Sequence, residues 1–405
     1  MKVVFIQPSY PVEQQEFTRG LAEVGATVIG VGSGPKAQQP ARTLRYLSAW
    51  VDAGNLLDLD RAARTIASKV RGLGVDRVES LWEPTVELAA KVRELLGIPG
   101  MTVDTAIGFR DKQVMMERAR AAGVRVPHSF RIRTAKEAWA AAERIGFPVI
   151  LKPIAGAGSA DTYRCDDADS FAQALALTRH VAEAVVAEFI DGEEFTCDCV
   201  VIDNTPVFES ISQYFPRPLI ARSEQWISPA QITFRDPYRP DLMGGIEMSR
   251  KVIAGLNLGT GFTHMEWYRT RKGEVVFGEI GARNGGGHLV DMMNWSNDFD
   301  VYREWARAVC WRSFEGEIGR KFFVGMVFKR ALGNGRIKAR LGVEEAAARC
   351  GRWLVSEQLL AVGTPRRDWK QTLVSDGFAA MRHPDEQAVT AMMDTWIRDV
   401  KLFAG

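Results

Sequence analysis

The sequence predicts a mixed α/β and α+β fold built from three units. Roughly the first hundred residues alternate apolar, strand-like runs with amphipathic stretches, which is typical of a parallel sheet flanked by helices. The middle of the chain holds a hairpin with one glutamate on each strand, in the stretch HMEWYRTRKGEVVFGEIGARNGGGH. The last part, from FFVGMVFKRA to a terminal helix, is a further α+β pattern. A chain of 405 residues is too long for one ordinary core, and we place the units at 1–105, 106–312 and 313–405.

The first unit begins with a β-α-β pattern. KVVFIQ is followed by an amphipathic stretch over Glu13–Val24 and then by ATVIGVG. A helix over Leu59–Leu73, the strand VDRVESLW and a helix over Thr85–Leu96 continue the alternation. No GxGxxG follows the first strand, so the unit lacks the signature of a dinucleotide-binding domain.

The second unit starts near Asp111 with a small α+β module. Its expected elements are a helix over Lys112–Ala122, a strand over Val124–Ile132, a Thr134-capped helix over Lys136–Ile145, a strand over Pro148–Lys152, a helix over Ala168–Thr178 and a strand over Ala184–Phe189. Strands over Thr196–Ile202 and Pro206–Ser210 then enter a larger sheet that includes the glutamate hairpin. The segment Tyr214–Gly245 is long and irregular, and such segments are more often functional than idle.

Charge and composition limit the classes of function. The chain has 52 Lys and Arg against 50 Asp and Glu, and this balance offers no footprint for nucleic acid or an anionic membrane. The apolar run in MKVVFIQPSYP is too short for a signal peptide, and no run approaches a membrane span. The five cysteines include no CxxC spacing, so we expect free thiols in a cytoplasmic protein, with Cys197 and Cys199 on opposite faces of one strand.

The hairpin is the most informative feature of the chain. A turn at Arg271–Gly273 brings Glu266 and Glu279 close to being cross-strand neighbours. Two carboxylates in that arrangement repel each other unless a cation lies between them. Few, hard oxygen ligands suit Mg²⁺ that arrives with a nucleotide. Arg283 follows the second glutamate, and Gly285–Gly287 leave backbone amides open to an anion.

Three other segments have the chemistry of a phosphate or nucleotide site, although each also has a plain structural interpretation. Lys152 ends the strand VILKP and precedes the glycine-rich run Ala155–Ala160, a workable phosphate cradle that is not a Walker A motif. Lys112 opens a helix, where the helix dipole disfavours a cation unless an anion is near. Glu188–Asp198 is a strand, a tight turn and a second strand, in which Glu194 could accept hydrogen bonds from ribose hydroxyls.

The order of these pieces resembles that of the ATP-grasp superfamily. A helix lysine, a strand lysine with a Gly/Ser loop, a hinge, two metal carboxylates and a trailing arginine follow one another over roughly residues 106–312. The resemblance implies an ATP-grasp fold with an N-terminal pre-ATP-grasp α/β domain, a small mobile lid over about 118–185 and a C-terminal α+β unit.

The resemblance also implies a role for individual positions. Lys112 and Lys152 are similar to the phosphate-binding lysines, and Glu266 and Glu279 to the Mg²⁺ (or Mn²⁺) ligands. Arg283 is similar to the arginine that contacts the transferred phosphoryl group. The remaining positions form the nucleotide site: the loop over the phosphates with Gly156, Gly158 and Ser159, the adenine hinge with Glu188, Phe189 and Ile190, and the ribose contact Glu194.

Two positions depart from the pattern of the superfamily. Many members have Asn two residues after the second metal glutamate, where this chain has Gly281, so one metal ligand is missing unless Asn284, water or substrate replaces it. The hinge often begins with Glu where this chain has Ala187. The HMEW…EIGAR form is similar to the L-amino acid ligase branch, which also has a small residue at the first position.

The implied activity is ATP-dependent ligation of a carboxylate to an amine through an acyl phosphate, giving an amide or peptide bond, ADP and phosphate. The partners would be small-molecule carboxylate and amine substrates, amino acids among them, and a homodimer is left open. Arg222, Trp226, His264 and His288 are candidate specificity residues, and a structural role stays open for both histidines. Two alternatives remain: a carboxylase similar to biotin carboxylase or to the purine-pathway enzymes, and a non-catalytic ATP-binding protein.

Overall fold

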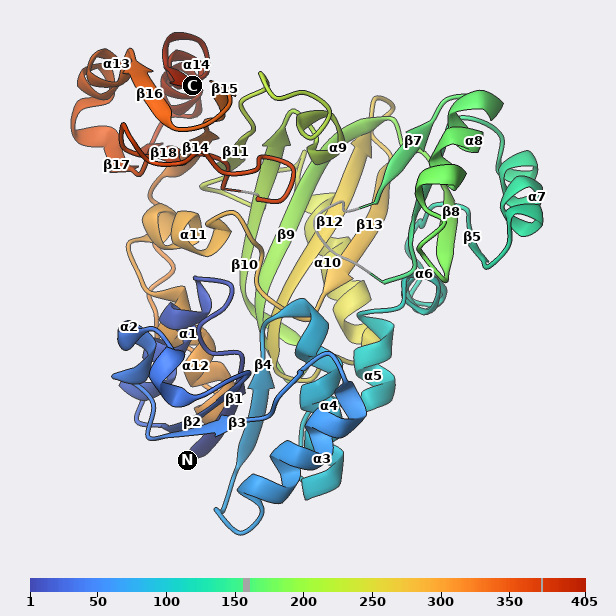
Figure 1. Ribbon diagram of the computed structural model, residues 1–405, viewed down its shortest axis with the longest axis vertical. Coiled ribbons are helices and arrows are strands. Elements are labelled where there is room, and N and C mark those ends of the chain that lie inside the picture. The colour runs from blue at the N-terminus through green and yellow to red at the C-terminus, as the bar shows by residue number, and fades with distance from the viewer. Residues whose placement is uncertain (156–160, 373) are drawn as a thin grey trace.

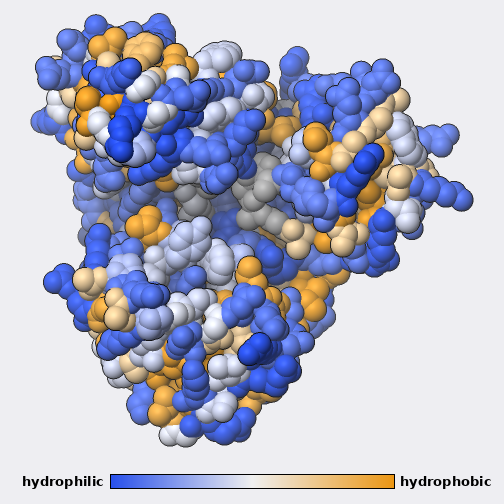
Figure 2. All heavy atoms as spheres, viewed as in Figure 1, coloured by the Kyte–Doolittle hydropathy of each residue, from blue (hydrophilic) through white to orange (hydrophobic). Residues whose placement is uncertain are grey.

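The chain folds into three lobes around one large sheet (Figure 1). The structure is a computed structural model that describes residues 1–155, 161–372 and 374–405. Gly156, Gly158 and Ser159, which we expect above the phosphates, lie outside the described residues. The surface is hollowed between the three lobes (Figure 2). Across the described residues, no helix is both long and apolar enough to cross a membrane.

The N-terminal lobe is a four-stranded parallel sheet in the order β3-β2-β1-β4. The side chains of Val3–Ile6 are fully buried, as expected for a parallel strand covered on both faces. Helices α1, α3 and α4 lie where the amphipathic stretches predicted them. The elements are β1 (Lys2–Ile6), α1 (Gln14–Glu23), β2 (Thr27–Gly32), η1 (Lys36–Gln38), α2 (Ala41–Leu44), β3 (Ala49–Asp52), α3 (Leu59–Val70), β4 (Arg77–Ser80), η2 (Glu83–Thr85) and α4 (Val86–Leu96).

The small lobe is an antiparallel sheet in the order β5-β8-β6-β7 with its own apolar core around Phe171. Thr134 caps α7 in a reciprocal capping box with Glu137, as the sequence predicted. The predicted strand over Val124–Ile132 is shorter in the structure because Pro127 lacks a backbone donor. The connecting and small-lobe elements are α5 (Val103–Gly108), α6 (Lys112–Ala121), β5 (Ser129–Ile132), α7 (Ala135–Ile145), β6 (Val149–Pro153), β7 (Tyr163–Cys165), α8 (Ala168–Leu177) and β8 (Ala184–Glu188).

The large sheet is antiparallel and follows the order β13-β12-β9-β10-β11-β14-β18-β17. The predicted boundary at residues 312–313 therefore lies within the span of one continuous sheet. Its strands are β9 (Gly192–Ile202), β10 (Thr205–Phe215), β11 (Ala230–Thr233), β12 (Gly261–Thr270), β13 (Val275–Gly281), β14 (Phe323–Phe328), β17 (Leu354–Glu357) and β18 (Phe378–His383). The short helix α9 (Pro218–Ala221) lies between β10 and β11.

Helices cover both faces of the large sheet. One apolar core contains side chains of α6 and α10 (Met243–Leu256), and the other contains side chains of α11 (Leu289–Asn297) and α12 (Val301–Trp311). The second core also contains β1 and α1, and Phe17 packs edge-on against Trp305 with ring centroids 5.1 Å apart. The N-terminal lobe is therefore joined to the large sheet by continuous apolar packing.

A second, three-stranded sheet of the C-terminal lobe has the order β15-β19-β16. Its elements are β15 (Ala331–Gly333), β16 (Ile337–Leu341), α13 (Val343–Cys350), η3 (Gly351–Trp353), α14 (Glu386–Asp399) and β19 (Lys401–Ala404). All five cysteines are free and buried. The expectation for Cys197 and Cys199 was wrong: residues two apart on a strand share one face, and their Sγ atoms are 3.9 Å apart.

Gly245 in α10 offers a test of this packing. In an exposed helix Gly→Ala stabilises by about 1 kcal/mol. Here a Cβ atom would lie 2.4 Å from the ring of Trp267, which is fully buried and stacked on Phe195. We therefore expect Gly245→Ala to lower the free energy of unfolding by about 1–3 kcal/mol in urea titrations. Ala254→Gly, at an exposed position of the same helix, measures the propensity term alone. Unchanged or higher stability of Gly245→Ala would contradict the prediction.

Candidate functional site

The two glutamates of the hairpin face each other as the sequence predicted. Glu266 on β12 pairs directly with Glu279 on β13 in the antiparallel register, and a bulge follows Glu266. Both expected lysines reach this pair. Lys112 Nζ is 3.4 Å and Lys152 Nζ is 3.7 Å from Glu279 Oε2. Side chains from helix α6 and from strand β6 of the small lobe therefore meet at the Glu279 carboxylate of the hairpin.

Local structure explains how each lysine is placed. Lys112 begins α6, which is capped by the Asp111 side chain, and its backbone N–H donates to the carbonyl of Ile154 beyond the end of β6. The positive end of the helix dipole disfavours a lysine there, and Glu279 supplies the anion that the sequence argument required. Lys152 lies near the end of β6 in the small lobe. Its side chain reaches Glu279 on the large sheet.

The charges at this point change the ionisation of the groups. Burial raises the pKa of Glu279, but Lys112, Lys152 and Arg283 outweigh it and lower that pKa to about 2. Burial and the charge of Lys112 lower the pKa of Lys152, against the attraction of Glu279. Glu279 is thus an anion across the physiological pH range, as a ligand for a hard cation must be.

A cleft that is open to solvent lies between the sheet of the small lobe and the large sheet. Eight of the residues expected in the site line it: Lys112, Lys152, Glu188, Phe189, Ile190, Glu194, Glu266 and Glu279. Arg283 lines an adjoining, smaller hollow together with Lys112 and Glu279.

Several polar groups of the expected hinge, Glu188–Ile190, already make hydrogen bonds within the protein. The carboxylate of Glu188 accepts hydrogen bonds from Arg125 Nη2 at 2.7 Å and from the backbone of His128 at 3.0 Å. The backbone N–H groups of Glu188 and Phe189 donate to the carbonyls of His128 and Pro148. These contacts occupy the Glu188 carboxylate and the backbone N–H groups of Glu188 and Phe189 within the protein.

Arg217 is a member of this cleft that the sequence analysis missed. Its Nε donates to Glu194 Oε2 at 3.0 Å and its Nη1 to the carbonyl of Ile190 at 2.7 Å. Its guanidinium also lies over the rings of Phe189 and Tyr268. Burial and the nearby Glu266 raise the pKa of Glu194 to about 7, against the attraction of Arg217. The irregularity of Tyr214–Gly245 was the only signal for this arginine.

The specificity residues expected in that segment lie elsewhere. Trp226 is 71% exposed, and Arg222 donates to the carbonyl of Lys370. Neither is among the residues that line the cleft. His288 Nδ1 lies 2.7 Å from Asp291 Oδ2, and the imidazole ring packs on the ring of Phe378. Both contacts are structural.

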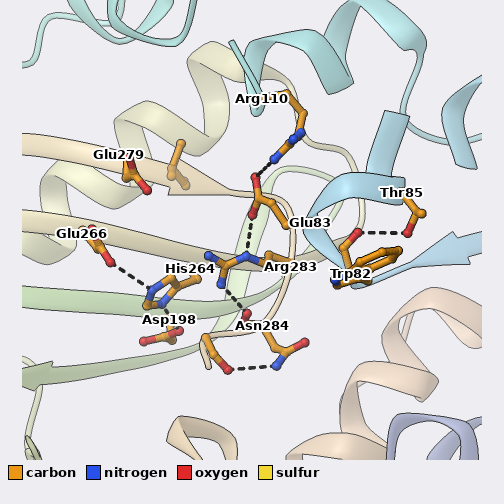
Figure 3. Close-up of polar contacts among 12 residues, drawn as sticks. Trp82, Glu83, Thr85, Arg110, Asp198, His264, Glu266, Glu279, Arg283 and Asn284 are labelled. Atoms are coloured by element: carbon orange, nitrogen blue, oxygen red, sulfur yellow. Dashed lines mark hydrogen bonds and ion pairs between the residues drawn. The ribbon is translucent and has the colours of Figure 1, made fainter. Parts of the chain in front are cut away.

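His264 links Glu266 to the buried side chain of Asp198 (Figure 3). Its Nδ1 is 2.8 Å from Asp198 Oδ1 and its Nε2 is 3.7 Å from Glu266 Oε1. Burial lowers the pKa of His264, but the charge and hydrogen bond of Asp198 outweigh it and raise the pKa to about 9. Both ring nitrogens of the protonated imidazole then face carboxylates. Asp198 was missed because β12 pairs with β9, 66 residues away.

A second ion cluster surrounds Arg283. Its Nε donates to Glu83 Oε2 at 2.5 Å, and its Nη1 donates to the carbonyl of Asn284 at 2.7 Å. The other oxygen of Glu83 accepts from Arg110 Nη1 at 2.5 Å. Burial raises the pKa of Glu83, but the two arginines outweigh it and the net pKa is lowered. Glu83 and Arg110 carry no motif that the sequence analysis could have detected.

The donor set fits a metal that brings most of its ligands with it. Within the described ranges, no group of three or more His, Cys, Asp or Glu side chains is arranged to hold a metal alone. Glu266 and Glu279 supply two facing carboxylates. Mg²⁺ commonly binds through one or two carboxylates together with water and substrate phosphates.

The His264–Asp198 pair predicts a pH-dependent stability. A folded pKa of about 9 against an ordinary value of 6.5 gives stabilisation that is fully present below pH 6.5 and lost as the pH rises through about 9. With chelator present, the difference in unfolding free energy between wild type and His264→Gln should shrink by up to about 3 kcal/mol between pH 6 and pH 10. A difference that stays constant over this range would show that His264 is not a buried cation.

Comparison with known proteins agrees with this geometry. A family model described as "ATP-grasp domain" matches residues 145–291. The "L-arginine-specific L-amino acid ligase" of Bacillus subtilis is 26% identical over 286 residues, which cover 67% of this chain and 66% of that protein. The "Alanine--anticapsin ligase" of Bacillus subtilis (strain 168) is 26% identical over 54% of this chain and 50% of that protein. The chain thus spans between half and two thirds of the length of these curated relatives.

Solved structures share the fold over the whole chain. An L-amino acid ligase from Bacillus licheniformis superposes with a TM-score of 0.79 at 19% identity, covering 100% of this chain and 98% of the other. A phosphoribosylglycinamide synthetase from Anaerococcus prevotii gives a TM-score of 0.70 at 16% identity, covering 100% and 99%. At these identities the superpositions establish the ATP-grasp fold alone. The matched domain model and the shared fold show that this chain has the ATP-grasp fold and contains an ATP-grasp domain over residues 145–291.

Proposed function

We propose that the protein is an ATP-dependent carboxylate–amine ligase that forms an amide or peptide bond through an acyl phosphate. One observation carries the proposal: Lys112 and Lys152 converge on Glu279, which faces Glu266 in the cleft. Two cations and two carboxylates at one point suit a bound triphosphate and its metal ion, and Arg283 adjoins them.

The nucleotide would lie along the cleft between the sheet of the small lobe and the large sheet. Lys112 and Lys152 would hold its phosphates through charge-assisted hydrogen bonds. At the other end, Phe189 and Ile190 would contact the base, and Glu194 would accept from the ribose hydroxyls. This orientation follows from the lysines and the hinge lying at opposite ends of the cleft-lining strands β6 and β8.

Glu266 and Glu279 would hold Mg²⁺ or Mn²⁺. When bound, the metal neutralises phosphate charge and helps to align the reacting groups. The protein contributes two oxygen ligands and leaves the rest of the coordination sphere to water and phosphate. The His264–Asp198 pair beside Glu266 limits the freedom of that ligand.

Arg283 would meet the charge that develops during the reaction. A substrate carboxylate attacks the γ-phosphorus, the bond to the β-phosphate oxygen breaks, and ADP leaves. The amine then attacks the acyl carbon, phosphate leaves, and the nitrogen gives up a proton. The guanidinium can stabilise the transferred phosphoryl group and the oxyanion of the second step. The names of two relatives, an L-arginine-specific L-amino acid ligase and an alanine–anticapsin ligase, favour amino acids as the substrate class.

The first test of this function concerns the metal. Glu279→Ala should abolish turnover because it removes one of two carboxylate ligands, the one that both lysines contact. ATP should raise the melting temperature of the wild type when Mg²⁺ is present, and much less in chelator. Equal stabilisation by ATP in chelator would refute the assignment of Glu266 and Glu279 as metal ligands.

The second test separates a ligase from a carboxylase. Enzyme, ATP, Mg²⁺ and an acid substrate should give a hydroxamate when hydroxylamine is added, without bicarbonate, because hydroxylamine captures an acyl phosphate. A pairwise screen of amino acids for phosphate release identifies the acid, and the natural amine should then compete with trapping. Turnover that requires bicarbonate, with no hydroxamate from any organic acid, would replace the ligase by a carboxylase. ATP binding without any turnover would support a non-catalytic protein.

A further inference from the structure

Glu83 connects the N-terminal lobe to the expected catalytic arginine. It follows β4 and begins η2, 200 residues before Arg283 in the chain. Its carboxylate is buried between Arg110 and Arg283, with one oxygen for each, at 2.5 Å in both contacts. The side chain therefore bridges two arginines from two other parts of the fold (Figure 3).

The turn that carries Glu83 is itself held rigidly. Ser80 and Thr85, both buried, share a hydrogen bond of 2.7 Å across the turn, and Thr85 Oγ1 donates to the carbonyl of Trp82. Pro84 fixes the backbone at the second position of η2. The N-terminal lobe is packed on the large sheet through Phe17 and Trp305, so the carboxylate has a defined position relative to β13.

Gly281 provides the space for this contact. A Cβ atom at this position would lie 3.0 Å from Glu83 Oε2 and 3.2 Å from Arg283 Cγ. A Cβ atom there would require the carboxylate or the arginine to shift by a few tenths of an ångström. This is the position at which many ATP-grasp proteins have the Asn metal ligand, and the strand register places it opposite His264.

The contacts fix the plane of the Arg283 guanidinium. Glu83 holds its Nε, and the carbonyl of Asn284 holds its Nη1. Among the described residues no hydrogen bond to Nη2 is seen. Because the guanidinium is planar, fixing Nε and Nη1 also fixes the direction in which Nη2 points. A donor with a fixed direction can stabilise negative charge at one defined point.

We propose that Glu83 is a positioning residue for Arg283, and that Gly281 leaves the space in which it acts. The proposal rests on the proposed function, since Arg283 acts on the transferred phosphoryl group and the oxyanion only if the protein is a ligase. In this chain, the site of a missing metal ligand is used to orient the arginine from another lobe. The alignment of Arg283 then depends on the packing of the N-terminal lobe against the large sheet.

The main experiment compares Glu83→Gln with a matched control, Glu79→Gln. Both glutamates come from the β4 region, are largely buried and pair with an arginine; Glu79 pairs with Arg93 at 3.1 Å and does not contact Arg283. Glu83→Gln keeps the size of the side chain and should lower kcat about 10–100-fold with KM for ATP nearly unchanged. The MgATP-induced rise in melting temperature should stay as in wild type. Glu79→Gln should keep the wild-type kcat.

A double-mutant cycle tests the role of Gly281. Gly281→Ala should lower kcat in the wild-type background because its Cβ displaces the Glu83–Arg283 pair. In a Glu83→Ala background, where the carboxylate is gone, the same change should cost much less. Equal costs in the two backgrounds would show that Gly281 acts independently of Glu83 and would overturn that part of the proposal. If Glu83→Ala does not fold, the comparison of Glu83→Gln with Glu79→Gln still decides the role of Glu83.

A spectroscopic measurement keeps this proposal separate from the proposed function. With ¹⁵N-labelled arginine, the Arg283 Nε–H resonance, assigned by its loss in Arg283→Lys, should lie downfield in wild type and move upfield in Glu83→Gln. If wild type makes no product with any substrate pair, the ligase function fails while this measurement still decides the contact. An unmoved Arg283 resonance, an unchanged kcat, or a raised KM for ATP with normal kcat in Glu83→Gln would each overturn the positioning role.

Discussion

The structure depends on one electrostatic constraint: two carboxylates face each other across a hairpin and must be surrounded by cations. Glu266 and Glu279 are direct cross-strand neighbours, an arrangement that like charges oppose. Lys112, Lys152 and Arg283 supply the compensating charge and hold the pKa of Glu279 at about 2. They come from α6, from strand β6 of the small lobe and from the segment after β13. The contacts at Glu279 therefore link the small lobe to the large sheet.

The alternation of positive and negative side chains continues beyond Glu266 and Glu279. His264 lies between Glu266 and Asp198, and Glu83 lies between Arg283 and Arg110, so that positive and negative groups alternate. Removing one partner of a buried ion pair costs about 3–5 kcal/mol because the other charge is left uncompensated. These buried ion pairs therefore constrain how the N-terminal lobe, the hairpin and the small lobe are placed relative to one another. Surface ion pairs would constrain that placement less.

Sequence reasoning succeeded where chemistry is encoded locally. The predicted turn at Arg271–Gly273 and the alternation along the two strands brought Glu266 and Glu279 close to being cross-strand neighbours, and the structure pairs them directly. Lys152 was a candidate because it was expected at a strand end, and it lies near the end of β6. Residues that act through non-local pairing could not be found. Asp198 meets His264 only because β12 inserts beside β9, and Glu83 reaches Arg283 only because α1 and α12 join two lobes. The strand order of the large sheet, which joins segments on both sides of residue 312, has no local signal either.

Gly281 shows how the meaning of one position changes with structure. In the sequence it is a missing ligand, since the superfamily often has Asn there. In three dimensions glycine leaves the space in which the Glu83 carboxylate approaches Arg283 to 2.5 Å, because a Cβ would lie 3.0 Å from that carboxylate and would require a shift of a few tenths of an ångström. A side chain at this position of the hairpin would therefore press on the carboxylate of the N-terminal lobe. The small residue at position 281 and the Glu83 bridge are two aspects of one packing arrangement.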